Sequence, residues 1–343
     1  MKKILTFFIA VILIFSLTAC GEKKAVLNVY NAGDYIDPQV LKDFEKEFGI
    51  KINYEEYGSN EEMLAKVQAG GTAYDVIVAS DYMIQAMIRQ GLLEEIDMNS
   101  FENYKNIGSE FKNLAHDPEN KYSVPYFWGT MGIIYDPAKV DEKIDSWSAL
   151  WNPKYKGQII MLDSPRDTIG VALKKLGYSF NTRDLEKLEE AKKELIKQRA
   201  LVKAYAVDAI KQIMLSKEAA IALAWSGDGI AVTRENPNLK YIIPKEGTNL
   251  WFDCFAVPTT TKQKENAKLF INYMMRPDVA AKCSNYVGYS TANKEGMKLL
   301  PKDLRENESA YPKGNIFEKG EIFEDLGDFT TEYDRIWTEI KSY

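Results

Sequence analysis

The chain has 343 residues, of which 45% are hydrophobic and 12% aromatic, and it carries a formal net charge of −6 at pH 7. A chain of this length normally folds into two units rather than around one core, and its acidic balance argues against a nucleic acid as partner. Its single histidine, His116, rules out a histidine cluster for zinc and leaves little for a catalytic triad.

Residues 1–19 have the pattern of an export signal. Two lysines precede the apolar run 4–15, which is too short to span a membrane. Residues 17–20, Leu-Thr-Ala-Cys, then match the lipobox of bacterial lipoproteins. We therefore expect a lipoprotein signal peptide at 1–19, a lipid on Cys20, and a tether at 20–25 that holds the protein outside the cytoplasmic membrane, on the periplasmic side if the host has an outer membrane. An ordinary signal peptide with a chance cysteine is the alternative.

The folded part of the chain begins with a strand–helix–strand unit. Leu27–Tyr30 is a short β-prone run. Asp37 can cap a helix that begins at Pro38 and ends before Gly49, and Ile50–Tyr54 alternates apolar and polar side chains like a second strand. Such a unit implies parallel strands with helices on the faces of the sheet, which is an α/β fold.

The remaining elements follow in chain order from the same signals. Ser59 and Glu62 form a capping box before a helix. Asp75–Ala79 is an apolar strand of the parallel-sheet kind, and Ser80 opens the helix after it. Gly129 lies between two extended runs and is expected to be a hinge. Further strands are expected at 122–128, 131–135, 158–162, 219–225, 241–244 and 250–258, further helices up to 176 and at 184–199, 263–275, 277–284 and 329–340, and a loop at 286–293.

Carboxylates and aromatic rings recur at the predicted strand ends, where ligands bind in open α/β sheets. Asp253 is the best candidate, because an acid between Phe252 and Cys254 in an apolar strand is expensive to bury without a function. Trp225 and Trp251 lie beside polar loops. These residue types together suit a ligand that is both cationic and partly apolar.

Most of these candidates also have a structural explanation. Asp34 could be a turn residue, Asp228 could cap the helix that follows it, and Asp167 could pair with Ser164 in a capping box. The tryptophans could belong to the core, and tyrosines are common at ordinary strand ends.

The cysteines leave one question open. If Cys20 carries lipid, Cys254 and Cys283 remain, and cysteines of an exported protein can pair. Cys254 lies in an apolar strand, where it could be a small buried hydrophobe. We therefore favour free thiols over a disulfide.

Seven segments, spread in order along residues 26–343, resemble the bacterial polyamine-binding lipoproteins, which are the spermidine/putrescine-binding subunits of ABC importers. These segments are YNAGDYI, YDVIVASDYM, YSVPYFWGT, SWSALWNPKYKG, AWSGDG, LWFDCFAVP and GYSTAN. The resemblance implies a two-lobed type II periplasmic-binding-protein fold, in which each lobe is a mixed sheet flanked by helices and a hinge joins the lobes. Residues 26–128 and 255–318 would form lobe 1, and residues 129–254 and 319–343 would form lobe 2.

The resemblance also implies a binding site. Asp253 matches the central amine-binding carboxylate of the family, and Trp225 and Trp251 match its aromatic platforms. The ligand-binding residues implied are Asp34, Tyr35, Ser80, Tyr82, Asp167, Trp225, Asp228, Trp251, Asp253 and Tyr289. The function implied is that of a monomeric solute-binding protein, not an enzyme and without cofactor or metal, that captures a polyamine by lobe closure and delivers it to a membrane permease.

Three positions depart from the family pattern. Ala32 stands where the family usually has a tryptophan, Ser164 replaces an aspartate of spermidine binders, and Phe323 stands near a position where they can have a glutamine. Asp34 and Asp228 match acidic positions of the putrescine-preferring relatives. Putrescine is therefore favoured over spermidine, and a different organic cation stays open.

Other functions compete with this interpretation. The same fold could bind another organic cation, a sugar or a ferric ion, although tryptophans among the tyrosines are poor metal ligands. An exported hydrolase is less favoured, because the chain lacks a nucleophile elbow, a phosphate loop and a dinucleotide fingerprint. A surface protein with a signalling or adhesive role could also have kept the fold.

Overall fold

The computed structural model describes residues 25–314 and 316–342. The predicted signal peptide, Cys20 and nearly all of the predicted tether therefore lie outside the described residues. Within the two described ranges, no helix combines the length and the apolar character needed to cross a membrane.

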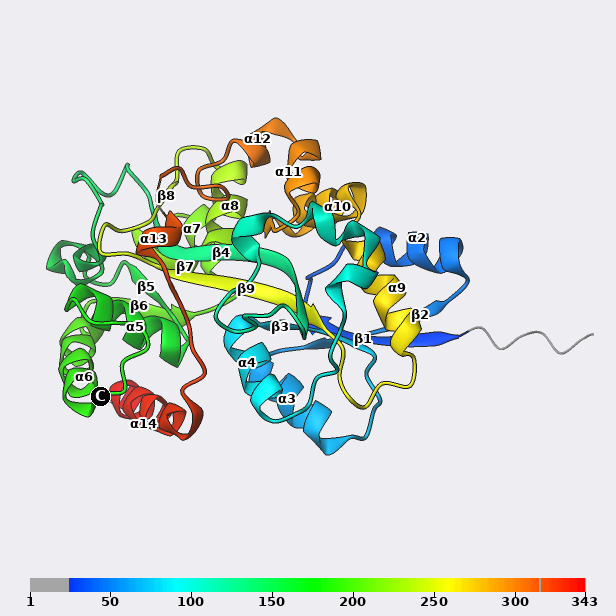
Figure 1. Ribbon diagram of the computed structural model, residues 1–343. Helices are drawn as coiled ribbons and strands as arrows, with labels where there is room; N and C mark the ends of the chain where they lie inside the picture. Colours follow the sequence, from blue (N-terminus) through cyan, green and yellow to red (C-terminus); the bar gives the residue numbers. More distant parts are fainter. Residues whose placement is uncertain (1–24, 315, 343) are drawn as a thin grey trace, which may run out of the picture.

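The described chain is an α/β structure (Figure 1). Its strands are β1 (Val26–Ala32), β2 (Lys51–Tyr57), β3 (Val76–Ser80), β4 (Ser123–Tyr135), β5 (Ile159–Leu162), β6 (Val202–Ala206), β7 (Ile221–Trp225), β8 (Lys240–Ile242), β9 (Asn249–Ala256), β10 (Ser290–Thr291) and β11 (Glu321–Ile322). Its α-helices are α2 (Pro38–Phe48), α3 (Asn60–Ala69), α4 (Asp81–Arg89), α5 (Pro165–Lys175), α6 (Leu185–Arg199), α7 (Ile210–Leu215), α8 (Ser226–Glu235), α9 (Lys264–Met274), α10 (Pro277–Val287), α11 (Lys294–Leu299), α12 (Lys302–Arg305), α13 (Ile316–Lys319) and α14 (Thr330–Ser342). Short 3-10 helices occupy Met98–Ser100, Glu102–Asn106, Ser109–Phe111, Trp147–Trp151, Pro153–Tyr155 and Gly327–Phe329.

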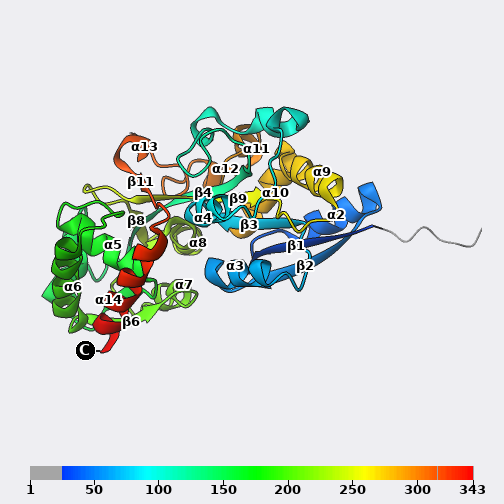
Figure 2. The same cartoon turned by 60° about the horizontal axis from the view of Figure 1, so that its bottom comes forward.

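The strands join in one mixed sheet with the order β2-β1-β3-β9-β4-β7-β5-β6. The predicted strand–helix–strand unit is confirmed, because β1 pairs in parallel with β2 and also with β3. At the other end of the sheet, β5 pairs in parallel with β6 and β7. Between these two groups, β9 runs antiparallel to β3, β4 runs antiparallel to β7, and β9 and β4 are antiparallel to each other. Both strands cross the middle of the molecule in Figures 1 and 2. The predicted α/β fold with mixed strand directions is therefore confirmed, and the strands of the two predicted lobes join in one continuous sheet rather than forming a separate sheet in each lobe.

Local signals explain where the first helices begin and end. The Asp37 carboxylate accepts a hydrogen bond from the Gln39 backbone N–H at 2.8 Å, and Pro38 opens α2. Gly49 ends α2 with a left-handed backbone (φ 71°), which glycine adopts without a steric penalty. The Ser59 hydroxyl accepts from the Glu62 N–H at 3.2 Å, as the capping box predicts.

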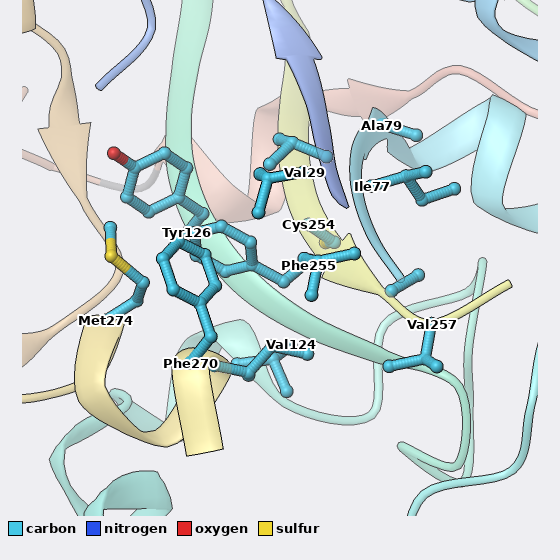
Figure 3. Close-up of a cluster of buried hydrophobic side chains, with 14 of the residues drawn as sticks. Val29, Ile77, Ala79, Val124, Tyr126, Cys254, Phe255, Val257, Phe270 and Met274 are labelled. Atoms are coloured by element: carbon cyan, nitrogen blue, oxygen red, sulfur yellow. The ribbon is translucent and has the colours of Figure 1, made fainter. Parts of the chain in front are cut away.

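The buried side chains form two main clusters. One is built from residues within 27–128 and 250–316, and the other from residues within 131–239 together with Phe323. Figure 3 shows part of the first cluster, where Tyr126, Phe255 and Phe270 pack together. Two of the predicted lobe boundaries fall inside β4 and β9, which run through both halves of the sheet, and the third falls inside α13. The division into lobes stays a prediction.

Some local predictions were wrong. The runs 122–128 and 131–135 form one continuous strand through Gly129, with a bulge near Pro125. The predicted loop 286–293 instead contains the end of α10 and the short strand β10, which pairs with β4. Tertiary hydrogen bonds across the sheet override the local glycine and loop signals at both places.

Cys254 and Cys283 are both buried free thiols, which confirms the favoured alternative. The Cys254 sulfur lies 3.6 Å from His116 Nε2. Burial lowers the pKa of His116 to about 4, so this imidazole is neutral near pH 7.

Candidate functional site

Asp253 lies at the junction of the two halves of the sheet. It is a residue of β9 and pairs across the sheet with Ser80, the last residue of β3. The Ser80 hydroxyl donates to one Asp253 oxygen at 2.7 Å, and the Tyr35 hydroxyl donates to the other. Burial raises the pKa of Asp253 above its ordinary value, and these two hydrogen bonds oppose that rise. The side chains that donate hydrogen bonds to the Asp253 carboxylate are thus both uncharged hydroxyl groups.

Ser80 is itself held in place by α3. The Asn60 side-chain amide donates to the Ser80 hydroxyl at 3.1 Å, and its carbonyl oxygen accepts from the Ser80 backbone N–H at 3.2 Å. Asn60 is the first residue of α3, so the capping signal at Ser59 also positions this contact.

Four aromatic rings form a series of contacts that includes Tyr35, the hydrogen-bond partner of Asp253. The Tyr35 ring lies edge-on to Phe127 and to Tyr289, with centroids 5.3 Å and 5.4 Å apart. The Tyr289 ring in turn lies 5.3 Å from that of Trp251. The Trp251 indole N–H donates to the Thr130 carbonyl at 3.3 Å, which fixes the orientation of this ring. These contacts are in the range of favourable aromatic pairs.

Asp167 and Trp225 form a second pair within the set. The Trp225 indole N–H donates to one Asp167 oxygen at 3.2 Å, and the Ser164 hydroxyl donates to the other at 2.6 Å. Ser164 makes no side-chain capping bond to the backbone of α5, so the capping-box explanation of Asp167 does not hold. Burial raises the pKa of Asp167, and both hydrogen bonds work against the rise.

Asp228 lies in the first turn of α8, directly after β7, and is 7% exposed. Lys211 Nζ lies 4.0 Å from one of its oxygens. Burial raises the pKa of Asp228 to about 6, and the Lys211 charge partly offsets that rise. Asp228 belongs to the same part of the chain as Trp225, because Trp225 ends β7 and Asp228 lies in the first turn of α8.

Tyr82 connects the two halves of the molecule. Its partly buried ring packs against both main core clusters. Its hydroxyl donates to Glu61 at 3.0 Å, and burial raises its pKa well above the ordinary value. The residue stands in the first turn of α4, two positions after Ser80.

Asp34 is placed apart from these groups. It is exposed and has a left-handed backbone (φ 54°) in the turn after β1, as the turn explanation of this residue anticipated. Of the three departures from the family pattern, Ala32 ends β1, and Phe323 is buried with the Arg166 guanidinium 4.5 Å from its ring centroid.

Several residues that support the site were not predicted from the sequence. These are Asn60, Glu61, Phe127, Thr130 and Lys211. The capping box pointed to the start of α3 but not to the contact between Asn60 and Ser80, which requires the sheet register. Lys211 had no signal, because α7 was itself not predicted.

The site has the chemistry of a receptor for an organic cation. Asp253 and Asp167 form no ion pair with a basic side chain among the described residues, although the Arg166 guanidinium acts favourably on the charge of Asp167. Aromatic rings lie beside both acids. A buried carboxylate without a counter-ion is costly, and a cationic ligand would remove that cost. No group of three or more His, Cys, Asp and Glu side chains is arranged to hold a metal ion anywhere in the described ranges.

Comparison with known proteins places the chain in a family. Residues 39–303 match the model of the bacterial extracellular solute-binding proteins. The spermidine/putrescine-binding periplasmic protein of Escherichia coli is 35% identical over 94% of each chain. The putrescine-binding periplasmic protein SpuD of Pseudomonas aeruginosa is 32% identical, also over 94% of each chain.

Solved structures agree. A putative spermidine/putrescine ABC transporter protein from Listeria monocytogenes superposes with a TM-score of 0.88 at 40% identity, over 93% of this chain and all of the other. The substrate-binding protein PotD of Streptococcus pneumoniae gives a TM-score of 0.84 at 40% identity, over 93% and 99%. This is a family of solute-binding transport components rather than of enzymes. The chain belongs to the bacterial extracellular solute-binding proteins, among the spermidine/putrescine-binding members of that family.

Proposed function

We propose that this protein captures a polyamine for an ABC importer, with putrescine as the favoured ligand and spermidine as the alternative. The observation that carries the proposal is the Asp253 carboxylate, which accepts only from the neutral Tyr35 and Ser80 hydroxyls among the described residues and lies beside a cluster of aromatic rings. The names of the relatives support the same ligand class.

The physical argument starts from the ligand. A linear polyamine has an ammonium at each end and methylenes between them, and each ammonium must be paired and hydrogen-bonded when it leaves water. Asp253, Asp167 and Asp228 supply carboxylates for this purpose. Trp225, Trp251, Tyr35 and Tyr289 supply aromatic faces, each worth about 0.5–2 kcal/mol to a well-placed cation.

Capture requires the two proposed lobes to close over the ligand. In the predicted division, Tyr289 belongs to lobe 1, whereas Gly227 and Asp228 belong to lobe 2. The ring of Tyr289 lies against Gly227, and Tyr82 packs against both cores, so ligand residues from both sides meet. Closure would exclude water and strengthen each charged contact.

The preference for putrescine rests on three positions. Ala32 supplies no aromatic platform and Ser164 no charge. Phe323, whose buried ring packs against the Arg166 guanidinium, has no side-chain oxygen or nitrogen to hydrogen-bond with a third amine. Spacing of the remaining carboxylates would then suit the shorter ligand. The exposed Asp34 would join the site only by a movement of its turn.

The proposed cellular setting follows the family and the N-terminal sequence. Members of the family are extracellular or periplasmic. We propose that Cys20 carries a lipid that anchors a monomeric protein to the membrane, and that permease subunits of an ABC transporter receive the ligand. Another organic cation, a sugar or a ferric ion in the same fold is the competing proposal.

Isothermal titration calorimetry on the chain from Gly21 onward, stripped of bound ligand by unfolding and refolding, tests the proposal. Putrescine, spermidine, choline, glucose and ferric citrate are titrated in turn. We expect a Kd of about 1 μM or lower for putrescine and no heat from glucose. Folded protein that binds neither polyamine would refute the proposed function, and binding of choline or ferric ion alone would identify the competing one.

A further inference from the structure

Lys211 stands beside one of the proposed amine-binding carboxylates. It is on α7, and its Nζ lies 4.0 Å from Asp228 Oδ1. Half of the Lys211 side chain is exposed, whereas only 10% of the Asp228 side chain is. In the described part of the chain, no other basic side chain lies within ion-pair distance of Asp228, and no hydrogen bond to its carboxylate is formed.

This ion pair lies at the binding site and not on a remote surface. Asp228 and Asp253 both act electrostatically on the Tyr289 hydroxyl, and so does the exposed Asp208 that precedes α7. The ring of Tyr289 lies against Gly227, the neighbour of Asp228. The protein's own ammonium group therefore reaches the carboxylate that a ligand ammonium would use.

We propose that Lys211 is an internal competitor for Asp228, which lowers the affinity for ligands that carry an amine at this end of the site. This inference rests on the proposed function and names Lys211 as the group that sets the affinity for the amine ligand. In the empty site, Lys211 supplies a counter-ion for the buried carboxylate. When a diamine binds, two cations would meet at one carboxylate, so Lys211 must move away into water.

The asymmetry of the pair makes this exchange possible. A half-exposed lysine gains little from an ion pair, because water screens its charge and the side chain loses freedom. A ligand ammonium enclosed by aromatic rings and carboxylates is screened less. Lys211 should therefore be displaced by the ligand, but at a cost that weakens binding by about two- to fivefold.

The test uses calorimetric titration of the chain from Gly21 onward with two ligands. Putrescine has an ammonium at both ends, whereas 1-aminobutane has the same carbon chain with only one. Removal of the lysine charge in Lys211→Met should strengthen putrescine binding about two- to fivefold, and should strengthen 1-aminobutane binding by less than about twofold, because its single ammonium belongs at Asp253.

Lys187→Met is the matched control. It removes the same charge from a lysine that pairs with Asp184 at 3.4 Å on α6, and its side chain is 43% exposed. This variant should bind putrescine as the wild type does. In an Asp228→Asn background, Lys211→Met should change the affinity by less than about twofold, because the carboxylate for which the two cations compete is gone.

The outcomes separate this inference from the proposed function. If the wild type binds putrescine but Lys211→Met binds it equally or more weakly, the competitor role is refuted and the proposed function stands. An equal gain in Lys187→Met would refute it as well, since the effect would then be one of net charge. If the wild type binds no polyamine, both fail.

Discussion

Substitution of Gly227 by alanine tests whether ligand binding requires contact between the two proposed lobes. A Cβ added there would lie 1.2 Å from Cε1 and 1.9 Å from Cδ1 of Tyr289, so the ring would have to move. Gly227 is in α8 of proposed lobe 2, whereas Tyr289 follows α10 in proposed lobe 1. In Gly227→Ala the clash would therefore act on the closed arrangement and not on the separated lobes.

The magnitude has two parts with opposite signs. Forcing an extra methyl group into a packed contact costs about 1–3 kcal/mol, which would weaken putrescine binding about 5- to 150-fold. Alanine is also a better helix residue than glycine by up to about 1 kcal/mol. The ligand-free Gly227→Ala protein should then melt at the same temperature as the wild type or slightly higher, while it binds less tightly.

The assay combines calorimetric titration with thermal unfolding of the ligand-free protein. Gly71→Ala is the control, because its added Cβ would meet no atom within 4 Å and its backbone is not left-handed. Wild-type affinity in Gly227→Ala would refute the reasoning. So would a loss of affinity accompanied by an equal loss of stability, because the clash would then act within one folded unit.

Three further predictions follow from individual contacts. Burial raises the pKa of Asp228 to about 6, so its ionised fraction and its attraction for an ammonium fall as the pH drops. Titrations with putrescine at pH 7.5 and pH 5 should show about tenfold weaker binding at pH 5 from this group alone. An equally large pH response in Asp228→Asn would contradict the role of Asp228 in binding. Trp225→Phe keeps an aromatic ring but removes the N–H that donates to Asp167, so we expect putrescine to bind about five- to tenfold more weakly. Unchanged affinity for putrescine would show that Asp167 and Trp225 do not belong to the binding site. Asn60→Ala removes the hydrogen bond to the Ser80 hydroxyl and should weaken putrescine binding about threefold. Asn53→Ala is the control, because Asn53 forms an exposed hydrogen bond with Asn28, and this variant should bind as the wild type does. Equal effects of the two substitutions would show that Asn60 has no positioning role.

The fold could largely be predicted because its first units carry strong local signals. The cap at Asp37, the glycine at 49 and the capping box at Ser59 each act within a few residues, and the structure uses all three. The segment Val202–Ala206 has no such signal. It is a partly exposed strand at one edge of the sheet, and only its pairing with β5 makes it a strand.

Several residues of the candidate site could be proposed from the sequence, but their arrangement could not. An acid within an apolar strand pointed to Asp253 without any knowledge of its partners. Its hydrogen bond with Tyr35 joins residues 218 positions apart in the chain, so it depends on the sheet order β1-β3-β9. Lys211 could not be predicted at all, because its importance arises only from its distance to Asp228.

The most direct test of the account is calorimetric titration of Asp253→Asn with putrescine, beside the wild type. Asparagine keeps the shape of the side chain but removes the charge that an ammonium would pair with. Loss of one partner of a buried charged contact costs about 2–5 kcal/mol, so binding should weaken about thirtyfold or more.

The Asp253→Asn substitution should weaken putrescine binding without lowering the stability of the ligand-free protein. Burial raises the folded-state pKa of Asp253, which means that its ionised form destabilises the ligand-free protein near pH 7 and that asparagine removes this cost. We predict an unchanged or higher melting temperature together with the loss of putrescine binding. Putrescine binding at wild-type strength in a folded Asp253→Asn protein would contradict the account.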